Sequence, residues 1–300
     1  MIYDILLDVF CYCKSPCVIY CISQVCKLWN LAMADSIAYY SIKTLSQYGL
    51  SYEAVQYFRW GCEHGHLSIV KWCCKTFDLN LGDFHSSDDY VILKTCQNGH
   101  LDILRYICKK FRLTINDIRV WSSGPFRTAC KNGHLKLAQW LYKTFQLTKE
   151  EDACTYDNYI LKELCKQGNL EFLQWIYSTF YLTREDIQAD QNYAFQFSCQ
   201  NGHLDTAKWL ADTFQLTKID VCSNENKAFR MACKNGYFDV VKWIYNSFSL
   251  TLEDVCVMNN YALHYADQYG YYSIVQWILC EEGKRATGYQ KIGHLIFARS

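Results

Sequence analysis

The stretch CKNGHLKLAQW, residues 130–140, decides the fold because close copies of it recur along most of the chain. The copies are centred on glycines at positions 65, 99, 133, 168, 202, 236 and 270. Successive glycines are 34 residues apart, except for one gap of 35 between Gly133 and Gly168. Seven copies at a nearly fixed spacing predict a repeat architecture rather than a single globular core.

Each copy has the pattern of two helices separated by the glycine. In the third copy Pro125 marks the expected start of the first helix, residues 125–132, and Gly133 is the expected C-terminal cap. The second helix follows with apolar residues at helical spacing: Leu135, Leu137, Ala138, Trp140 and Leu141. One such pair cannot bury enough apolar surface to offset its conformational entropy. We therefore predict an all-α solenoid in which neighbouring copies cover one another.

A second signature, Phe-x-Leu-Thr with Asn in the first copy, follows the second helix of the first six copies. It begins at positions 77, 111, 145, 180, 214 and 248. Asp or Glu stands three residues after each of its threonines, a spacing typical of a capping box, which predicts a short helical turn between copies. These threonines are Thr114, Thr148, Thr183, Thr217 and Thr251.

The repeat Gly-His-Leu-x-x-hydrophobic, with small residues three and four before the glycine, resembles the ankyrin repeat. Pro125 and His264 fall on the proline and histidine of that family's T-P-L-H-x-A segment. The resemblance implies an ankyrin-like solenoid of seven repeats over residues 51–283 that binds a protein target on its concave face. Phe-x-Leu-Thr replaces the stretch that builds the family's β-finger, so we expect no finger. The style of divergence is similar to that of ankyrin proteins from large DNA viruses.

The amino-terminal segment, residues 1–35, lacks the repeat and resembles an F-box. Residues 3–10, Ser15-Pro16 and residues 22–29 carry the resemblance. It implies a small helical domain that docks on the adaptor subunit of a cullin-based ubiquitin ligase. The residues at the matching positions are Ile5, Leu6, Val9, Phe10, Val25 and Trp29. The alternative is a helical cap that only shields the first repeat.

We expect residues 36–50 to form a connecting helix or linker, and residues 284–300 a tail or cap. Thirty basic and thirty acidic residues cancel, so the chain has no general field for nucleic acid or an anionic membrane. It also has no run of about 18 apolar residues and no signal peptide. These features predict a cytoplasmic or nuclear protein, in the host cytoplasm if it is viral.

The cysteines and histidines of the repeats favour packing over chemistry. Six of the eighteen cysteines occupy one repeat position, where cysteine acts as a small hydrophobe. The histidines after the repeat glycines should bond loop backbone, and the regularly spaced tryptophans should form a core stripe. We expect no catalysis, metal or cofactor. A cysteine hydrolase would need a low-pKa thiol beside a histidine.

Two positions in each repeat are candidates for contact with the target. Five residues before the glycine stand Trp60, Phe197, Met231 and Tyr265, which are either partner anchors or contacts to the neighbouring copy. Two residues before the glycine the basic members are Lys131, Lys166 and Lys234. The sequence thus predicts an adaptor, in which repeats hold a target and the first segment recruits a ligase. Its alternative is a plain interaction scaffold.

Overall fold

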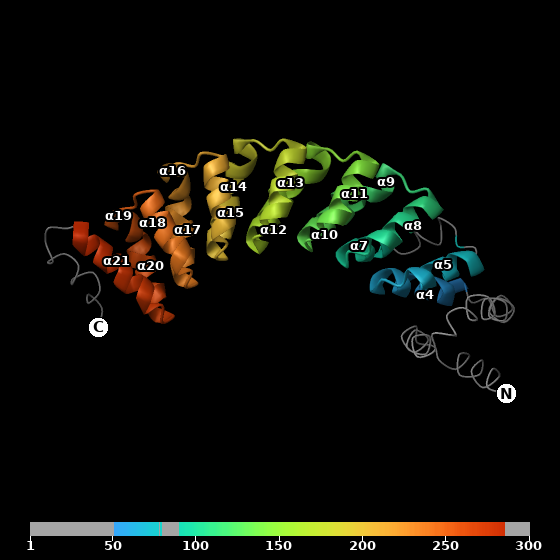
Figure 1. Ribbon diagram of the computed structural model, residues 1–300, viewed down its shortest axis with the longest axis horizontal. Coiled ribbons are helices and arrows are strands. Elements are labelled where there is room, and N and C mark those ends of the chain that lie inside the picture. The colour runs from blue at the N-terminus through green and yellow to red at the C-terminus, as the bar shows by residue number, and fades with distance from the viewer. Residues whose placement is uncertain (1–50, 78, 80–89, 286–300) are drawn as a thin grey trace, which may run out of the picture. The chain divides into compact units, whose positions relative to one another are not determined.

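The computed structural model of the protein describes residues 51–77, 79 and 90–285 (Figure 1). The predicted F-box-like segment, the connecting segment 36–50 and residues 286–300 lie outside the described residues. The chain divides into two compact units, the first ending at Gln146 and the second beginning at Leu147. This boundary falls inside the predicted repeat array, next to the one irregular glycine spacing.

The described residues of unit 1 form three helix pairs and one connecting turn. The pairs are α4 (Ser51–His64) with α5 (Leu67–Thr76), α7 (Tyr90–Gln97) with α8 (Leu101–Phe111), and α10 (Val120–Lys131) with α11 (Leu135–Phe145). The short helix α9 (Ile115–Ile118) connects α8 to α10. The predicted alternation of first and second helices is therefore present.

Unit 2 repeats the same alternation four times. The pairs are α12 (Thr155–Gln167) with α13 (Leu170–Phe180), α14 (Arg184–Gln200) with α15 (Leu204–Thr213), α17 (Ser223–Lys234) with α18 (Phe238–Ser247), and α20 (Val257–Gln268) with α21 (Tyr272–Arg285). The π-helix η1 (Lys149–Ala153) precedes the first pair, and α16 (Lys218–Val221) and α19 (Leu252–Val255) precede the last two. Throughout the described ranges the chain is helical and contains no strand, so the all-α prediction is confirmed there.

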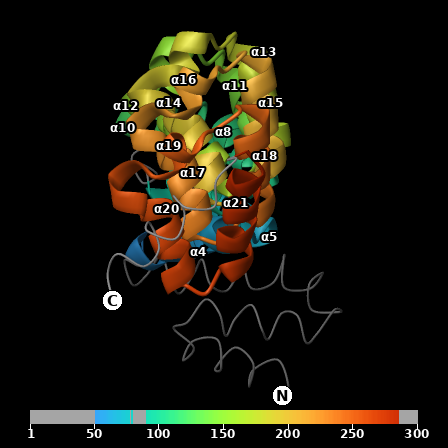
Figure 2. The same ribbon diagram turned by 90° about the vertical axis from the view of Figure 1, so that its left-hand side faces the viewer.

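The helices of unit 2 form two layers. Figure 2 shows α12, α14, α17 and α20 in one row and α13, α15, α18 and α21 in the other. Neighbouring first helices pack directly against one another, whereas the second helices contact each other far less and pack on the first helices. Close first helices and spread second helices are the geometry of a curved stack with the first helices on its inner side.

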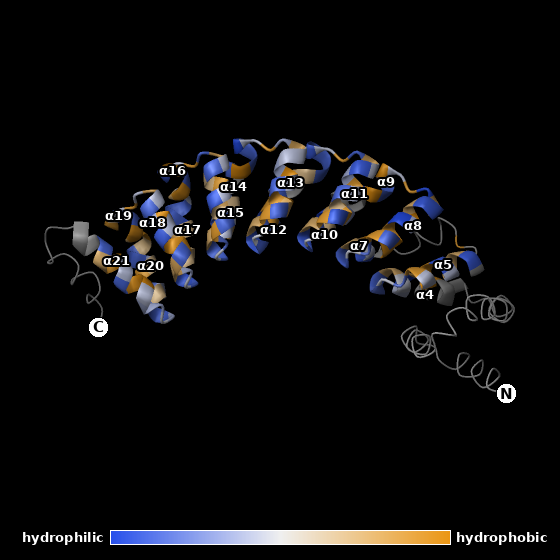
Figure 3. Cartoon of the chain, viewed as in Figure 1, coloured by the Kyte–Doolittle hydropathy of each residue, from blue (hydrophilic) through white to orange (hydrophobic). Residues whose placement is uncertain are grey.

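Hydrophobic and hydrophilic residues both occur along the helices (Figure 3), and many of the hydrophobic ones form the buried core. In α13 the buried residues are Phe172, Leu173, Ile176 and Phe180, a run with helical period. The six repeat cysteines are also buried, and burial raises the pKa of each thiol. They are Cys62, Cys96, Cys130, Cys165, Cys199 and Cys233. The prediction that they pack as small hydrophobes is confirmed.

The repeat glycines end the first helices with a left-handed backbone, as predicted. Gly202, for example, has φ +78°, and a Cβ there would collide with the ring of Tyr237 in the next copy. In other copies a histidine takes the place of this ring. His134 Nε2 donates to the carbonyl oxygen of Gln97 at 2.8 Å, and His203 Nε2 to that of Lys166 at 2.9 Å. The histidines therefore bond backbone, as expected, and the carbonyl oxygen that each of them reaches belongs to the preceding copy.

Two predictions about the helices are wrong in detail. The helix α10 begins at Val120, five residues before the predicted start, and Pro125 lies inside it. Pro125 lies in the second turn of α10, where its missing N–H removes one backbone hydrogen bond. This proline therefore does not mark the start of the helix. The tryptophans are half-buried rather than core residues. Each of Trp72, Trp140, Trp175, Trp209 and Trp243 instead packs edge-on against the Phe that opens the following Phe-x-Leu-Thr signature.

The single irregular glycine spacing has a structural counterpart in η1. Four of the predicted capping boxes are present, at Thr114, Thr183, Thr217 and Thr251. At Thr148 the backbone N–H bonds the carboxylate of Asp152, four residues on, instead of Glu151. The extra residue of this copy thus widens the turn into a π-helix, which is how helical turns commonly absorb a one-residue insertion.

Candidate partner-binding surface

The first helices of unit 2 carry a surface stripe that we call the first-helix face. It consists of the residues nine, five and two positions before each glycine, a spacing that places them on one side of a helix. Its members are Tyr159, Glu163, Lys166, Tyr193, Phe197, Gln200, Lys227, Met231, Lys234, Tyr261, Tyr265 and Gln268. All of them are exposed or half-buried.

Cations and aromatic rings alternate across this face from helix to helix. The ring of Tyr193 on α14 lies near two lysines. The Nζ of Lys162 from α12 is 5.2 Å from the ring centroid, and the Nζ of Lys227 from α17 is 4.6 Å from it. On the other side of α17, Arg230 lies 4.9 Å from the ring of Tyr261, and Lys234 lies 4.9 Å from the ring of Tyr265. These distances are within the range of cation–π attraction.

Lys234 and Arg230 differ in what holds them. The Nζ of Lys234 donates to the hydroxyl of Tyr261 at 3.3 Å, and this hydrogen bond raises the pKa of Lys234. Arg230 is buried, and its Nε donates to the backbone carbonyl of Glu225 at 2.6 Å. Burial lowers the pKa of Arg230. Arg230 therefore secures the left-handed turn at Asn224–Asn226, while Lys234 stays on the surface.

The structure brings five of the predicted target-binding residues onto this one face. These are Lys166, Phe197, Met231, Lys234 and Tyr265. Phe197 packs on Tyr193 with ring centroids 5.3 Å apart, and Tyr265 packs on Tyr261 at 4.2 Å. Lys166 is exposed and pairs with Glu163 at 3.6 Å.

The two remaining described candidates belong to unit 1. Trp60 lies between two imidazoles of its own copy, with ring centroids 4.7 Å from His64 and 4.8 Å from His66. Lys131 is exposed at the end of α10. The ligase-docking candidates Ile5, Leu6, Val9, Phe10, Val25 and Trp29 lie outside the described residues.

The position nine residues before each glycine was not among the predicted target-binding positions. Tyr193, Lys227 and Tyr261 occupy it, four residues before Phe197, Met231 and Tyr265 respectively. This i, i+4 spacing was a signal that could have found them, because residues four apart are neighbours on a helix surface.

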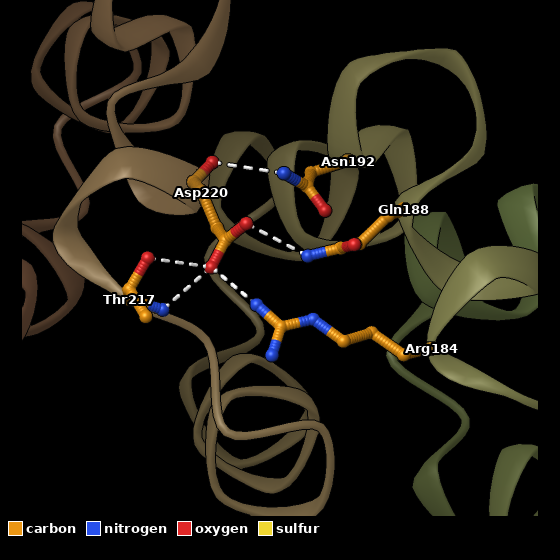
Figure 4. A network of polar contacts seen from close by, with 5 residues as sticks. All are labelled: Arg184, Gln188, Asn192, Thr217 and Asp220. Carbon is orange, nitrogen blue, oxygen red and sulfur yellow. Dashed lines mark hydrogen bonds and ion pairs between the residues drawn. The ribbon is translucent and has the colours of Figure 1, made fainter.

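The connecting turns of unit 2 carry a second polar arrangement, shown in Figure 4. The Oδ2 of Asp220 accepts from the backbone N–H and the hydroxyl of Thr217, both at 2.7 Å, and from Arg184 of the preceding copy at 2.8 Å. Its Oδ1 accepts from Gln188 at 2.7 Å, and its backbone carbonyl accepts from Asn192 at 3.0 Å. The carboxylate of Asp220 thus binds Thr217 of its own turn and both Arg184 and Gln188 of the preceding copy.

The same arrangement recurs at the neighbouring turns. Lys149 Nζ lies 2.6 Å from Asp186, and Lys218 Nζ lies 2.6 Å from Asp254. Burial opposes ionisation of Asp186, Asp220 and Asp254, but the hydrogen bonds from lysine, arginine and threonine outweigh it and hold the pKa of each carboxyl below its ordinary value. Asn158, Asn192 and Asn226 donate to the backbone carbonyls of the same three aspartates.

No group of three or more metal-ligating side chains occurs within residues 51–77, 79 and 90–285. Burial raises the pKa of the half-buried thiols Cys154 and Cys222, which is the opposite of what a nucleophilic cysteine needs. None of the helices in the described part has the length and apolar character needed to cross a membrane.

Comparison with known proteins identifies part of the repeat array. No curated protein matches the chain. The family model for ankyrin repeats, in three copies, matches residues 161–254, a range that runs from α12 to α19. Most of the first-helix face lies in this range, whose residues are similar to ankyrin repeats.

Proposed function

We propose that the chain is a non-catalytic protein-interaction module whose binding surface is the first-helix face of unit 2. Ankyrin repeats suggest a protein–protein interaction role, and residues 161–254 contain three of them. The observation that carries the proposal is the alternation of lysines and aromatic rings over α12, α14, α17 and α20.

The composition of this face suits a protein partner. Aromatic residues and Met are enriched at protein interfaces because they offer a large apolar contact area. Phe197, Met231 and Tyr265 are half-buried, so each offers apolar surface without being left fully in water. They also stand on helices, which hold side chains more precisely than loops do.

The repeat array extends, in this proposal, beyond the matched range to seven copies. The support is local geometry: Gly65, Gly99, Gly133 and Gly270 have the same left-handed backbone as the glycines of residues 161–254. The helix pairs of unit 1 also have the same order of first helix, glycine and second helix.

A site-specific photo-crosslinking experiment tests the binding surface. A photoreactive phenylalanine at position 197 should form partner adducts in cells, and the same group at Ile219, which is 85% exposed on α16, should not. The adduct at position 197 should disappear in the variant Lys227→Glu/Lys234→Glu. Equal adduct yields at both positions, or adducts that persist in the variant, would contradict the proposal.

We also propose that the amino-terminal segment recruits a cullin-based ubiquitin ligase through its adaptor subunit, which would make the chain a ligase adaptor. The support is the F-box resemblance at Ile5, Leu6, Val9, Phe10, Val25 and Trp29. The full-length chain should bind the purified adaptor subunit, and Phe10→Ala or Trp29→Ala should abolish that binding.

An absence of binding by the wild type, or binding that both variants retain, would leave the plain scaffold as the better account. In that account residues 51–300 alone lose solubility while no ligase component co-purifies.

For either role we propose a reducing compartment, the cytoplasm or nucleus. The thirteen cysteines among the described residues are free thiols. All of them are buried except Cys154, Cys222, Cys256 and Cys280.

A further inference from the structure

The first-helix face is basic although the whole chain is neutral. Among its residues and the two flanking cations that contact its rings, Lys162, Lys166, Lys227, Arg230 and Lys234 are basic and Glu163 is acidic. Most other carboxylates of unit 2 lie in the connecting turns or in the first turns of the second helices. Charge is therefore segregated toward one side of the unit.

Two cations of this face, Lys227 and Lys234, are not neutralised by carboxylates of the described residues as those of the turns are. Lys227 and Lys234 make no ion pair with a carboxylate of the described chain, and their ammonium groups lie on the rings of Tyr193 and Tyr265. A ring attracts a cation but carries no net charge, so the positive charge remains available. Lys162 and Lys227 even converge on the same ring, where like charges repel.

We propose that this face binds an acidic protein segment that also carries apolar side chains. Its carboxylates would meet Lys227 and Lys234, and its apolar groups would meet Phe197, Met231 and Tyr265. This proposal rests on the proposed function and specifies the chemistry of its partner. First helices pack about 10 Å apart, so an extended segment of roughly ten residues would span the three steps from α12 to α20.

A nucleic acid fits this face less well. Single-stranded nucleic acids need open aromatic rings on which bases stack, together with a groove that follows many phosphates. Here lysine ammonium groups already lie on Tyr193 and Tyr265, and Arg230 is buried. A peptide instead needs only the lysines and the half-buried apolar groups between them.

Fluorescence anisotropy with the full chain tests the proposal. The labelled ligand is a peptide of about ten residues that repeats the unit Glu-Glu-Phe-Glu-Leu. We expect it to bind, with an affinity that falls as salt is raised from about 0.05 M to about 0.5 M. Lys227→Glu/Lys234→Glu should weaken binding by about tenfold or more. Lys208→Glu, a single charge reversal on the second helix α15, should leave it unchanged.

Two further ligands, a Lys-Lys-Phe-Lys-Leu peptide and an oligouridine of equal length, complete the design. The proposal is overturned if either binds as tightly as the acidic peptide, if the acidic peptide does not bind below about 1 mM, or if the face variant binds it normally. Crosslinking at position 197 that depends on Lys227 and Lys234, without acidic-peptide binding, would overturn this proposal and leave the proposed function standing. An absence of both the crosslinking and the acidic-peptide binding would overturn this proposal and the proposed function together.

Discussion

The connecting turns and the first-helix face of unit 2 use the same cationic residue types in opposite ways. In the turns Lys149, Arg184 and Lys218 each lie 2.6–2.8 Å from a carboxylate of the next copy. On the face Lys227 and Lys234 lie 4.6 Å and 4.9 Å from the centroids of aromatic rings. The turns thus neutralise their charge internally to join the copies, whereas the face retains its charge toward solvent. A charge count alone cannot distinguish these roles, but position within the repeat does.

The largest effect is expected at the junction between copies, with Gly202→Ala. The left-handed backbone costs an alanine about 1 kcal/mol, and the collision with Tyr237 adds about 2 kcal/mol. Gly270→Ala is the matched control, because it has the same backbone and no neighbour within 4 Å. Urea unfolding should show a loss near 3 kcal/mol for the first variant and about 1 kcal/mol for the second. Equal losses would mean that the ring contact does not join the copies.

A smaller loss is expected at the hub of the turn network, with Asp220→Asn. Removing the charge weakens the bonds from Thr217 and Arg184, which should lower the free energy of unfolding by about 2 kcal/mol at pH 7.

The pH dependence of this variant sharpens the test. Because the folded protein holds the pKa of Asp220 below its ordinary value, the stabilisation is complete above about pH 4 and is lost as the pH falls through the lowered pKa. The difference between wild type and variant should therefore shrink below about pH 4. A difference that stays constant down to pH 2 would show that the carboxylate charge is not what fastens the turn.

The face should contribute little to folding. Lys227→Glu/Lys234→Glu removes two cation–π contacts at half-buried surface positions, so we expect a change in unfolding free energy of about 1 kcal/mol or less. Thermal unfolding by circular dichroism measures it directly. A loss as large as that of Asp220→Asn would place these lysines with the structural cations and remove the contrast between the two regions.

The smallest effect is a gain in stability at the end of a second helix. Tyr181 has φ +51° and is 83% exposed, so Tyr181→Gly relieves a left-handed backbone without losing a buried contact. We expect stabilisation of about 0.5 kcal/mol. Gln215→Gly, at the equivalent position, should gain less because Gln215 Nε2 donates to the carbonyl oxygen of Asp212 at 2.6 Å. Destabilisation by Tyr181→Gly in urea unfolding would contradict this expectation.

The sequence predicted the features that recur with a fixed period. The left-handed glycines, the buried cysteines and the threonine caps all follow from residues that return every 34 positions. The prediction that the histidines bond backbone followed from the same periodicity, whereas the copy that supplies the carbonyl oxygen did not. Each of these depends on local backbone geometry, which a repeated residue type specifies directly.

The side-chain contacts between copies could not be predicted, because the sequence does not show which copy contacts which. The link from Arg184 to Asp220 joins residues 36 positions apart, and nothing in either residue alone indicates its partner. The contact of Lys227 with Tyr193 likewise required the order of the helices in space. The prediction that the tryptophans form a core stripe was wrong, because helical period predicts a common side of the helix and does not predict how deeply that side is buried.

One paired measurement tests the division of roles most directly. Arg184→Ala/Lys218→Ala and Lys227→Ala/Lys234→Ala each remove two cations from unit 2, and both the free energy of unfolding and the affinity for the acidic peptide are measured for each variant. The account predicts that the turn variant loses stability and keeps its affinity at temperatures where it is folded, while the face variant keeps its stability and loses affinity. A face variant that loses stability and keeps its affinity, or a turn variant that loses affinity while folded, would contradict it.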